Sequence, residues 1–281
     1  MNLKYSLLFL LMLSFFELNA KVMIKKDISY RENCTDVRNL LDVYYSEDTQ
    51  IQKDVLIFIH GGSWNSGKKE TYWWLGKNMA KKNVVAVIIN YSLSPEAKYD
   101  RMASDCAKAV KWVNDSIGRF GGRRDRIFVM GHSAGGHLAA LINNDPRFFT
   151  NAGISNPING LIMNDSFGLD MFEYLSVAEQ DEHTLWFLDA FTRDQETWKV
   201  ASPMYYLENV RKPFLIVVGE KTYPAIKLQS KRLYDELRAA NKPTEYNTIK
   251  GKKHVGMIAQ MFFNKNQMYE LILAFMNKYS G

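Results

Sequence analysis

The hexapeptide Gly131–Gly136, with the sequence GHSAGG, constrains the fold more than any other stretch of this chain. It follows the apolar run Ile127–Met130, which is typical of a short buried strand, and it precedes His137–Ile142, which is typical of the first turns of a helix. A serine at G-x-S-x-G spacing on such a sharp strand-to-helix turn presents its hydroxyl above the sheet edge as a nucleophile. The flanking glycines permit the strained backbone that this turn requires. We therefore predict that Ser133 is a catalytic nucleophile, and a glycine-rich turn of a nucleotide-binding unit is the alternative.

A second glycine turn, with the sequence HGGSW, occupies residues 60–64 and directly follows the apolar run Val55–Ile59. Acyl transfer develops negative charge on the carbonyl oxygen of the substrate, and preorganised N–H donors stabilise that charge. A turn of this type supplies one or two backbone donors, and the residue after the nucleophile supplies another. We predict an oxyanion hole formed by three backbone N–H groups, those of Gly62, Ser63 and Ala134. The His60 side chain is interpreted as a turn histidine that hydrogen-bonds the backbone.

A general base is needed to activate a serine hydroxyl, and histidine is the usual one. The chain has five histidines, namely His60, His132, His137, His183 and His254. The first three belong to the two glycine motifs, and His183 lies in an acidic, aromatic-rich stretch without strand character. His254 follows the strand-like run Glu245–Ile249 and precedes a predicted amphipathic helix from about 259 to 278. We predict that His254 is the base; a surface histidine within a lysine-rich segment is the alternative.

The two glycine motifs resemble those of α/β-hydrolase-fold esterases that carry an HGGG-type turn. That group includes carboxylesterases, acetyl-xylan and feruloyl esterases, and kynurenine-formamidase-like enzymes. The resemblance runs from about residue 38 to the C-terminus and also includes Asn90–Pro95, Asp105, Trp112 and Ser202-Pro203. It implies an α/β-hydrolase fold, an acyl-enzyme mechanism without a cofactor, and a catalytic histidine that comes last in the order serine, acid, histidine.

The chain departs from these esterases at the expected position of the catalytic acid. There the strand equivalent to Phe214–Gly219 is followed by an aspartate, whereas this chain has Thr222 at that place. A threonine can hold an imidazole but cannot stabilise its positive charge, and losing the acid costs about 10⁴ in turnover. Asp165, after the strand-like run 160–164, is preferred as the replacement, with Glu220 as the second candidate. The departure also leaves a second functional hypothesis, a catalytically weakened binding protein on the same fold.

Elsewhere the chain alternates strand-like and helix-like segments. Strands are expected near 28–31, 40–45, 55–59, 84–90, 127–130, 160–164, 214–218 and 245–249, and helices near 70–82, 101–117, 225–240 and 259–278. This alternation predicts a mostly parallel sheet with helices on both faces. Residues 166 to about 203 interrupt it with a run of aromatic and acidic residues. By resemblance, this insertion is a helical cap whose aromatics either line an acyl pocket or only pack the cap onto the body.

The first twenty residues have the features of a secretory signal peptide: Lys4, the apolar core Ser6–Phe16 and a small residue, Ala20. We therefore expect a secreted or periplasmic protein, with residues 21–281 forming a single α/β-hydrolase domain. The apolar core is too short to span a bilayer, and no second run reaches that length. The resemblance together with this leader implies a small-molecule or carbohydrate-linked ester as substrate.

The charge and the cysteines exclude several other classes of function. The net charge is +6, but the basic residues are scattered and are not interleaved with aromatics as nucleic-acid grooves require, so no nucleic-acid partner is expected. No Cys/His cluster is available to ligate a metal ion. Whether the two cysteines, Cys34 and Cys106, pair is left open, and so is the oligomeric state.

Overall fold

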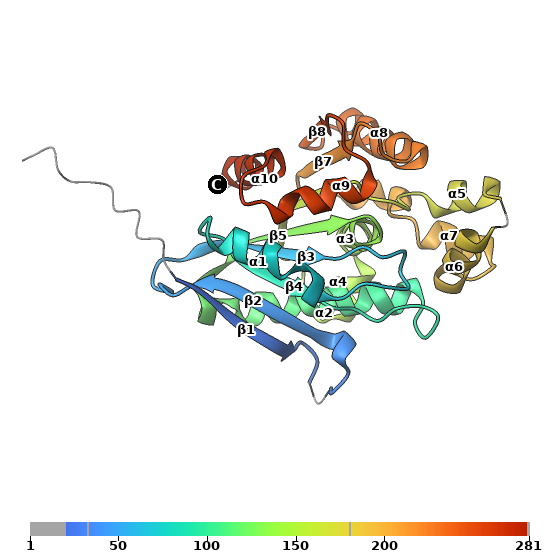
Figure 1. Cartoon of the computed structure of the whole chain (residues 1–281). Coiled ribbons are helices and arrows are strands. Elements are labelled where there is room, and N and C mark those ends of the chain that lie inside the picture. The colour runs from blue at the N-terminus through green and yellow to red at the C-terminus, as the bar shows by residue number, and fades with distance from the viewer. Residues whose placement is uncertain (1–20, 33, 180, 280–281) are drawn as a thin grey trace, which may run out of the picture.

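The computed structural model describes residues 21–279 except 33 and 180, so the predicted signal peptide lies outside the described residues. In the described part of the chain, eight strands form one sheet in the order β1-β2-β4-β3-β5-β6-β7-β8 (Figure 1). The strands are β1 (Val22–Ser29), β2 (Leu40–Ser46), β3 (Lys53–Ile59), β4 (Val85–Ile89), β5 (Gly122–His132), β6 (Ile158–Asn164), β7 (Phe214–Gly219) and β8 (Thr244–Ile249). β2 runs antiparallel to both of its neighbours, and β3 to β8 are parallel. The predicted mostly parallel sheet is confirmed.

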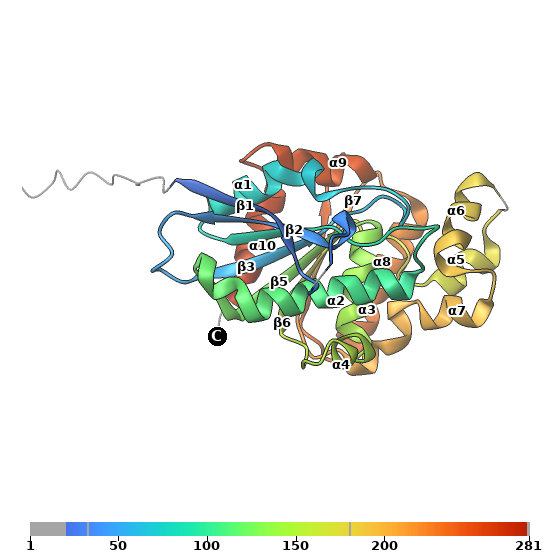
Figure 2. The same cartoon turned by 90° about the horizontal axis from the view of Figure 1, so that it is seen from below.

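Helices cover both faces of this sheet. They are α1 (Trp73–Ala80), α2 (Tyr99–Ser116), α3 (Ala134–Asn144), α4 (Arg147–Asn151), α5 (Met171–Val177), α6 (Glu182–Phe191), α7 (Gln195–Val200), α8 (Pro224–Ala239), α9 (His254–Ala259) and α10 (Gln267–Lys278). Short 3₁₀ helices are η1 (Val37–Asn39), η2 (Lys69–Tyr72), η3 (Ile117–Phe120), η4 (Pro203–Asn209) and η5 (Gln260–Phe262). Figure 2 shows α1 and α9 on one side of the sheet and α2 and α4 on the other.

The fully buried strand β4 shows how one apolar run serves both faces. Val85, Val87 and Ile89 belong to the core beneath α2, α3 and α8. Ala86 and Ile88 belong to the opposite core beneath α1, α9 and α10. Successive side chains of a strand point to opposite faces, so a strand covered on both sides has no polar alternation.

The prediction of a single helix from 259 to 278 is wrong. The chain forms α9 and η5, then turns, and α10 begins only at Gln267. The helical backbone ends at Phe263, which is extended (φ −81°, ψ 129°). Asn266, also extended (φ −163°, ψ 161°), then caps α10, because its side chain accepts from the Tyr269 N–H. The first strand also begins earlier than expected, at Val22 rather than at residue 28.

Three helices, α5 to α7, occupy the stretch where a helical cap is expected, and Figure 1 shows them gathered at one end of the sheet. Their aromatic side chains pack inward. Phe187 and Phe191 of α6 lie edge-on against the fully buried Trp64, with ring centroids 5.5 and 4.7 Å away. These two rings therefore join the cap to the body, as in the second alternative for the cap.

No described helix is long and apolar enough to cross a membrane.

Candidate active site

Ser133 lies at the turn between β5 and α3, with its backbone in a strained conformation (φ 54°, ψ −124°). The neighbouring glycines make this turn possible. A Cβ on Gly131 would overlap the Gly135 carbonyl, and a Cβ on Gly135 would overlap the Ile59 carbonyl of β3. The turn is thus as tight as the G-x-S-x-G spacing predicts, and it places the serine at the carboxyl end of the sheet.

His254 connects this serine to a carboxylate. Its Nε2 lies 2.9 Å from Ser133 Oγ, and its Nδ1 lies 2.6 Å from Asp165 Oδ2. The two distances define the tautomer: Nδ1 carries the hydrogen that it donates to the carboxylate, which leaves Nε2 to accept from the serine hydroxyl. His254 is the first residue of α9, so the loop after β8 carries it to the sheet edge where Ser133 lies.

Asp165 is fully buried immediately after β6, and three donors surround its carboxylate. Oδ1 accepts from the Gly219 N–H at 2.8 Å, and Oδ2 accepts from the Thr222 hydroxyl and from His254. Glu220, by contrast, accepts from the Gly251 N–H at the surface. The structure therefore brings Asp165, and not Glu220, to the imidazole.

Thr222 has a role that the sequence alone did not reveal. Thr222, at the position where similar esterases have an aspartate, donates its hydroxyl to the Asp165 carboxylate. A threonine hydroxyl can turn to suit an acceptor, and a charged acceptor strengthens such a hydrogen bond. The sequence did contain a signal for this contact, because Asp165 and Thr222 follow two strands that are adjacent in the sheet.

The 60–67 turn lies directly against the serine. A Cβ on Gly61 would approach the His132 carbonyl and Ser133 Cβ to about 3 Å. The predicted oxyanion donors belong to this turn and to the start of α3, namely the backbone N–H groups of Gly62, Ser63 and Ala134. Among the described residues, none accepts a hydrogen bond from these three groups. They are therefore available to a substrate oxygen, as the first N–H groups of a helix normally are.

His137 ties the cap to this turn. Its Nε2 donates to the Ala201 carbonyl beyond α7 at 2.7 Å, and its Nδ1 accepts from the Trp64 indole N–H at 3.2 Å. Burial lowers the pKa of His137 to about 4. His137 therefore fixes the position of Trp64, the residue that follows the predicted donors Gly62 and Ser63.

Two further histidines of the glycine motifs are buried and neutral. His60 Nδ1 donates to the Gly61 carbonyl at 2.8 Å, as its interpretation as a turn histidine requires. Its ring stacks on Tyr91, and burial lowers its pKa to about 4. His132 stacks on the His254 ring at a centroid distance of 4.8 Å, and burial lowers its pKa to about 3.

These three neutral imidazoles predict that stability falls on mild acidification. In the unfolded chain they bind protons below about pH 6.5, whereas in the folded chain they stay neutral until about pH 4. The unfolded state therefore binds up to three more protons between these values, and the free energy of unfolding should fall by up to about 4 kcal/mol per pH unit. Urea unfolding at pH 7.5, 6 and 5 measures this. His137→Gln should lower the slope by about one third, and equal stability at pH 7.5 and 5 would contradict the prediction.

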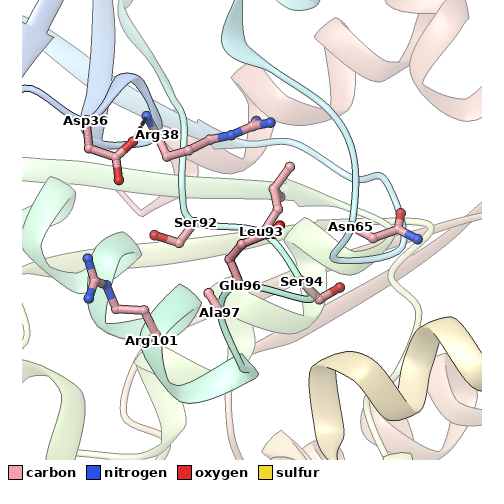
Figure 3. Close-up of a pocket in the computed structure, with 9 residues that line it drawn as sticks. All are labelled: Asp36, Arg38, Asn65, Ser92, Leu93, Ser94, Glu96, Ala97 and Arg101. Atoms are coloured by element: carbon pink, nitrogen blue, oxygen red, sulfur yellow. Dashed lines mark hydrogen bonds between the residues drawn. The ribbon is translucent and has the colours of Figure 1, made fainter.

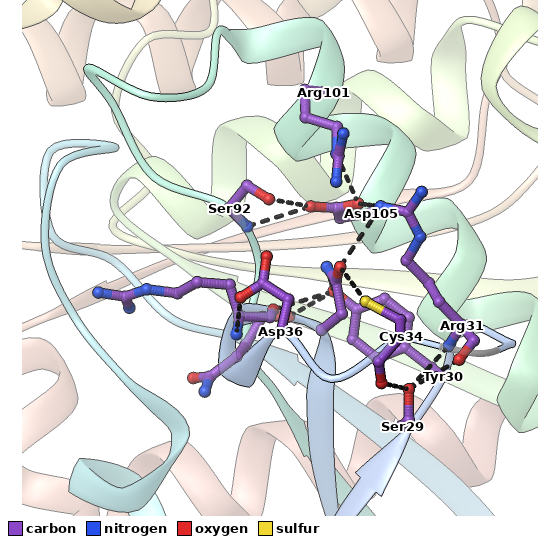
Figure 4. Close-up of polar contacts among 11 residues, drawn as sticks. Ser29, Tyr30, Arg31, Cys34, Asp36, Ser92, Arg101 and Asp105 are labelled. Carbon is purple, nitrogen blue, oxygen red and sulfur yellow. Dashed lines mark hydrogen bonds and ion pairs between the residues drawn. The ribbon is translucent and has the colours of Figure 1, made fainter.

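A polar bowl of about 490 Å³ lies beside the 60–67 turn (Figure 3). Asn65 of the turn lines it, together with Ser92 and Ser94 after β4 and Arg101 of α2. Figure 4 shows how its wall is held. The buried Asp105 accepts from the Ser92 backbone and hydroxyl and pairs with Arg101 and Arg31.

The two cysteines are free thiols, which answers the question that the sequence left open. Cys34 lies 3.3 Å from the Asn39 side-chain oxygen, and Cys106 is buried in α2. Among the described residues, no group of three or more His, Cys, Asp or Glu side chains is arranged to hold a metal ion.

Comparison with known proteins gives consistent matches. A family model described as BD-FAE matches residues 41–237. A probable isoprenylcysteine alpha-carbonyl methylesterase, ICMEL2 of Arabidopsis thaliana, is 28% identical over 84% of this chain and 60% of that protein. Esterase LipQ of Mycobacterium tuberculosis is 29% identical over 73% of this chain and 51% of that protein. This chain thus spans only about half to three fifths of the length of these curated relatives.

Solved structures show the same fold. Esterase B from Lactobacillus rhamnosis superposes with a TM-score of 0.77 at 19% identity, covering 92% of this chain and 85% of that one. A truncated carbohydrate esterase from gut microbiota gives 0.75 at 18% identity, covering 94% and 98%. The predicted α/β-hydrolase fold is confirmed.

Proposed function

The chain belongs to the BD-FAE family, and from this premise we propose that it is a serine hydrolase that cleaves carboxylic esters through an acyl-enzyme intermediate. One observation carries the proposal: Asp165, His254 and Ser133 form an unbroken chain of contacts of 2.6 and 2.9 Å at the tight turn after β5. Curated relatives with esterase names support the same reaction class.

The first half of the reaction follows from these contacts. Ser133 Oγ attacks the ester carbonyl carbon while its proton passes to Nε2 of His254. Asp165 stabilises the resulting imidazolium through Nδ1–H. The carbonyl oxygen, now negative, accepts from the N–H groups of Gly62, Ser63 and Ala134. Collapse of this intermediate breaks the bond to the alcohol oxygen, which takes the proton from His254 and leaves.

In the second half, water replaces the alcohol. His254 removes a proton from a water molecule, whose oxygen attacks the acyl carbon bound to Ser133. The new tetrahedral intermediate collapses, the proton returns to Ser133 Oγ, and the carboxylic acid departs. No cofactor takes part in this scheme.

The binding-protein hypothesis was based on Thr222, which stands where an acid is expected. The position of Asp165 removes the reason for that hypothesis. Thr222 does not leave the imidazole without a carboxylate, because it donates to the carboxylate that contacts His254. Three donors hold the buried Asp165 carboxylate in place, and such support is typical of a site in which the geometry of the acid matters for catalysis. We therefore favour catalysis over binding alone.

Labelling with a fluorophosphonate tests this assignment. The reagent phosphonylates a serine only when a base activates it and donors stabilise the developing oxyanion. We expect one equivalent of label per chain, mapped by mass spectrometry to the peptide that contains Ser133. A second sample, denatured before labelling, is the control. Label on another serine, or none on the folded chain, would contradict the proposal.

For the substrate we propose an ester of a small acyl group with a polar, carbohydrate-linked alcohol. Phe187 and Phe191 pack against Trp64, so their rings are not free to line a pocket for a long acyl chain. This packing supports a short acyl group. The bowl beside Asn65 offers hydroxyl, amide and guanidinium groups to an alcohol rich in hydroxyls. Acetate release from an acetylated oligosaccharide should exceed release from an acetylated long-chain alcohol at equal concentration; the reverse order would contradict this substrate.

A further inference from the structure

A group of exposed and half-buried aromatic and basic side chains lies outside the proposed site, where α1 meets the η5 turn. We call it the aromatic–lysine face, and its members are Trp73, Trp74, Lys77, Lys81, Lys82, Phe262, Phe263 and Lys265. Large apolar rings are exposed here: the relative accessibility is 45% for Trp73, 53% for Phe262 and 68% for Phe263. Single exposed apolar residues are ordinary, but contiguous ones mark interaction sites.

The rings are in mutual contact. Phe262 lies 6.3 Å from Trp73, 6.1 Å from Trp74 and 5.7 Å from Phe263 between ring centroids. Trp74 in turn lies 6.0 Å from Tyr72, whose ring stacks 6.1 Å from His60 in the turn next to Ser133. The rings thus form a continuous path from the exposed tip to the interior of the catalytic turn.

Hydrogen bonds hold the exposed tip in place. The Asn78 amide on α1 donates to the carbonyls of Met261 and Phe262, at 3.1 and 3.2 Å. The Asn266 amide donates to the Phe263 carbonyl at 2.7 Å. The fold therefore presents the phenyl rings to solvent on a turn whose backbone carbonyls are held by two side-chain amides.

Positive charge is concentrated in the two segments of the chain that carry these rings. Segments 68–83 and 250–266 hold nine lysines and one glutamate, in a chain whose net charge is +6. Lys69 is buried and pairs with the glutamate, Glu70, and with Asp27 and Asp42, so the other eight lysines carry the positive charge of these segments. The Lys77 ammonium lies 4.9 Å from the Trp73 ring. Burial and the neighbouring charges of Lys265 and Lys81 lower the pKa of Lys82. Without these two segments, the chain would be slightly acidic.

We propose that the aromatic–lysine face docks on the surface of an anionic phospholipid bilayer. Aromatic rings enter the boundary between headgroups and acyl chains, and lysines around them attract acidic headgroups, each contributing about 1 kcal/mol. Apolar insertion and basic attraction together provide the two contributions that stable peripheral binding needs.

Two other occupants fit these residues less well. Sugars and bases stack on flat ring faces, but Trp73 with Phe262 and Phe262 with Phe263 meet at 85° and 86°, which leaves no coplanar platform. A second copy of the chain would bring two faces of the same charge together, and their repulsion opposes a dimer.

Docking by this face brings the proposed active site close to the lipid. Helix α9 begins at His254 and leads directly into η5, and its six residues span about 9 Å. Val255, next to His254, is 68% exposed, and the exposed Tyr223 ring lies 5.3 Å from the His254 ring. Esters held at the headgroup level would therefore be near Ser133, while dissolved esters would reach it without docking.

Vesicle sedimentation of the full chain tests the docking. We expect binding to phosphatidylcholine vesicles with 30% phosphatidylglycerol, at least about tenfold weaker binding to phosphatidylcholine alone, and a similar loss in 1 M NaCl. Phe262→Ser/Phe263→Ser should weaken binding at least about tenfold, whereas Val37→Ser/Ile51→Ser, at two positions that are each 65% exposed, should not. Lys81→Glu/Lys265→Glu should weaken binding about tenfold, and Lys212→Glu/Lys242→Glu, before β7 and β8, should have much less effect.

The N-terminal twenty residues are common to all variants and cannot cause a difference between them. Every variant should hydrolyse a water-soluble ester at the rate of the unchanged chain, which shows correct folding and keeps this test separate from that of the catalytic assignment. Binding that is unaffected by the phenylalanine changes, or equal on neutral and anionic vesicles, would overturn the proposal. So would retention on an acidic polysaccharide in place of vesicles, or a dimer in light scattering that Phe262→Ser/Phe263→Ser dissociates.

Discussion

Ser133→Ala and His254→Ala should each lower the turnover of p-nitrophenyl acetate by about 10⁶. Removing either member of this catalytic unit should have the same effect, because the serine cannot be deprotonated without the base and no acyl-enzyme can form without the serine hydroxyl. Some rate above that in water should remain, since the N–H groups of Gly62, Ser63 and Ala134 are backbone atoms that neither substitution removes.

Stability should change little in either variant. Ser133→Ala deletes one hydrogen bond of 2.9 Å, worth about 1 kcal/mol, and leaves the strained turn to another residue with a Cβ. Turnover and the thermal midpoint are measured on the same preparations, with His183→Ala as the histidine control. Turnover of Ser133→Ala within tenfold of the unchanged chain would exclude Ser133 as the nucleophile, and a large loss in His183→Ala alone would move the base.

The sequence predicted the parts of this molecule that depend on local pattern. A buried strand, two glycines and a helix specify the turn at Ser133, because any side chain at Gly131 or Gly135 would overlap the neighbouring backbone carbonyls. The parallel sheet followed in the same way from apolar runs alternating with helical ones.

Other features depend on contacts between distant segments, and no local pattern contains them. The choice between Asp165 and Glu220 stayed open because the two follow adjacent strands, and only the direction of each side chain separates them. Phe262 and Phe263 continued an apolar periodicity, so the helix break between Phe263 and Asn266 was missed. His137 was grouped with the serine turn, whereas its partners Trp64 and Ala201 lie 73 and 64 residues away.

Asp165→Asn should lower turnover by roughly 10³ to 10⁴. The amide can keep the Gly219 contact through its oxygen, but its NH₂ group then faces Nδ1 of His254 and can only donate. The imidazole must change tautomer, so that Nε2 carries a hydrogen and cannot accept the Ser133 proton. Because the shape of the side chain is kept, the thermal midpoint should fall far less than the rate. Glu220→Gln, at a carboxylate that only caps Gly251 at the surface, is the matched control and should change turnover less than twofold.

Thr222→Asp separates the two possible acids, because it restores a carboxylate where similar esterases have one. If Asp165 is the acid, the new carboxylate replaces a donor and lies against a buried acceptor, so one of the two must take up a proton. Turnover at pH 7 should then fall, and stability should fall with it. Thr222→Val removes only the hydroxyl and should cost less, about tenfold or under in turnover. A gain in turnover from Thr222→Asp, or an Asp165→Asn variant that is unaffected, would show that the imidazole works without Asp165. In that case the threonine would mark a site that had lost its acid, and the contact between Asp165 and His254 would be structural.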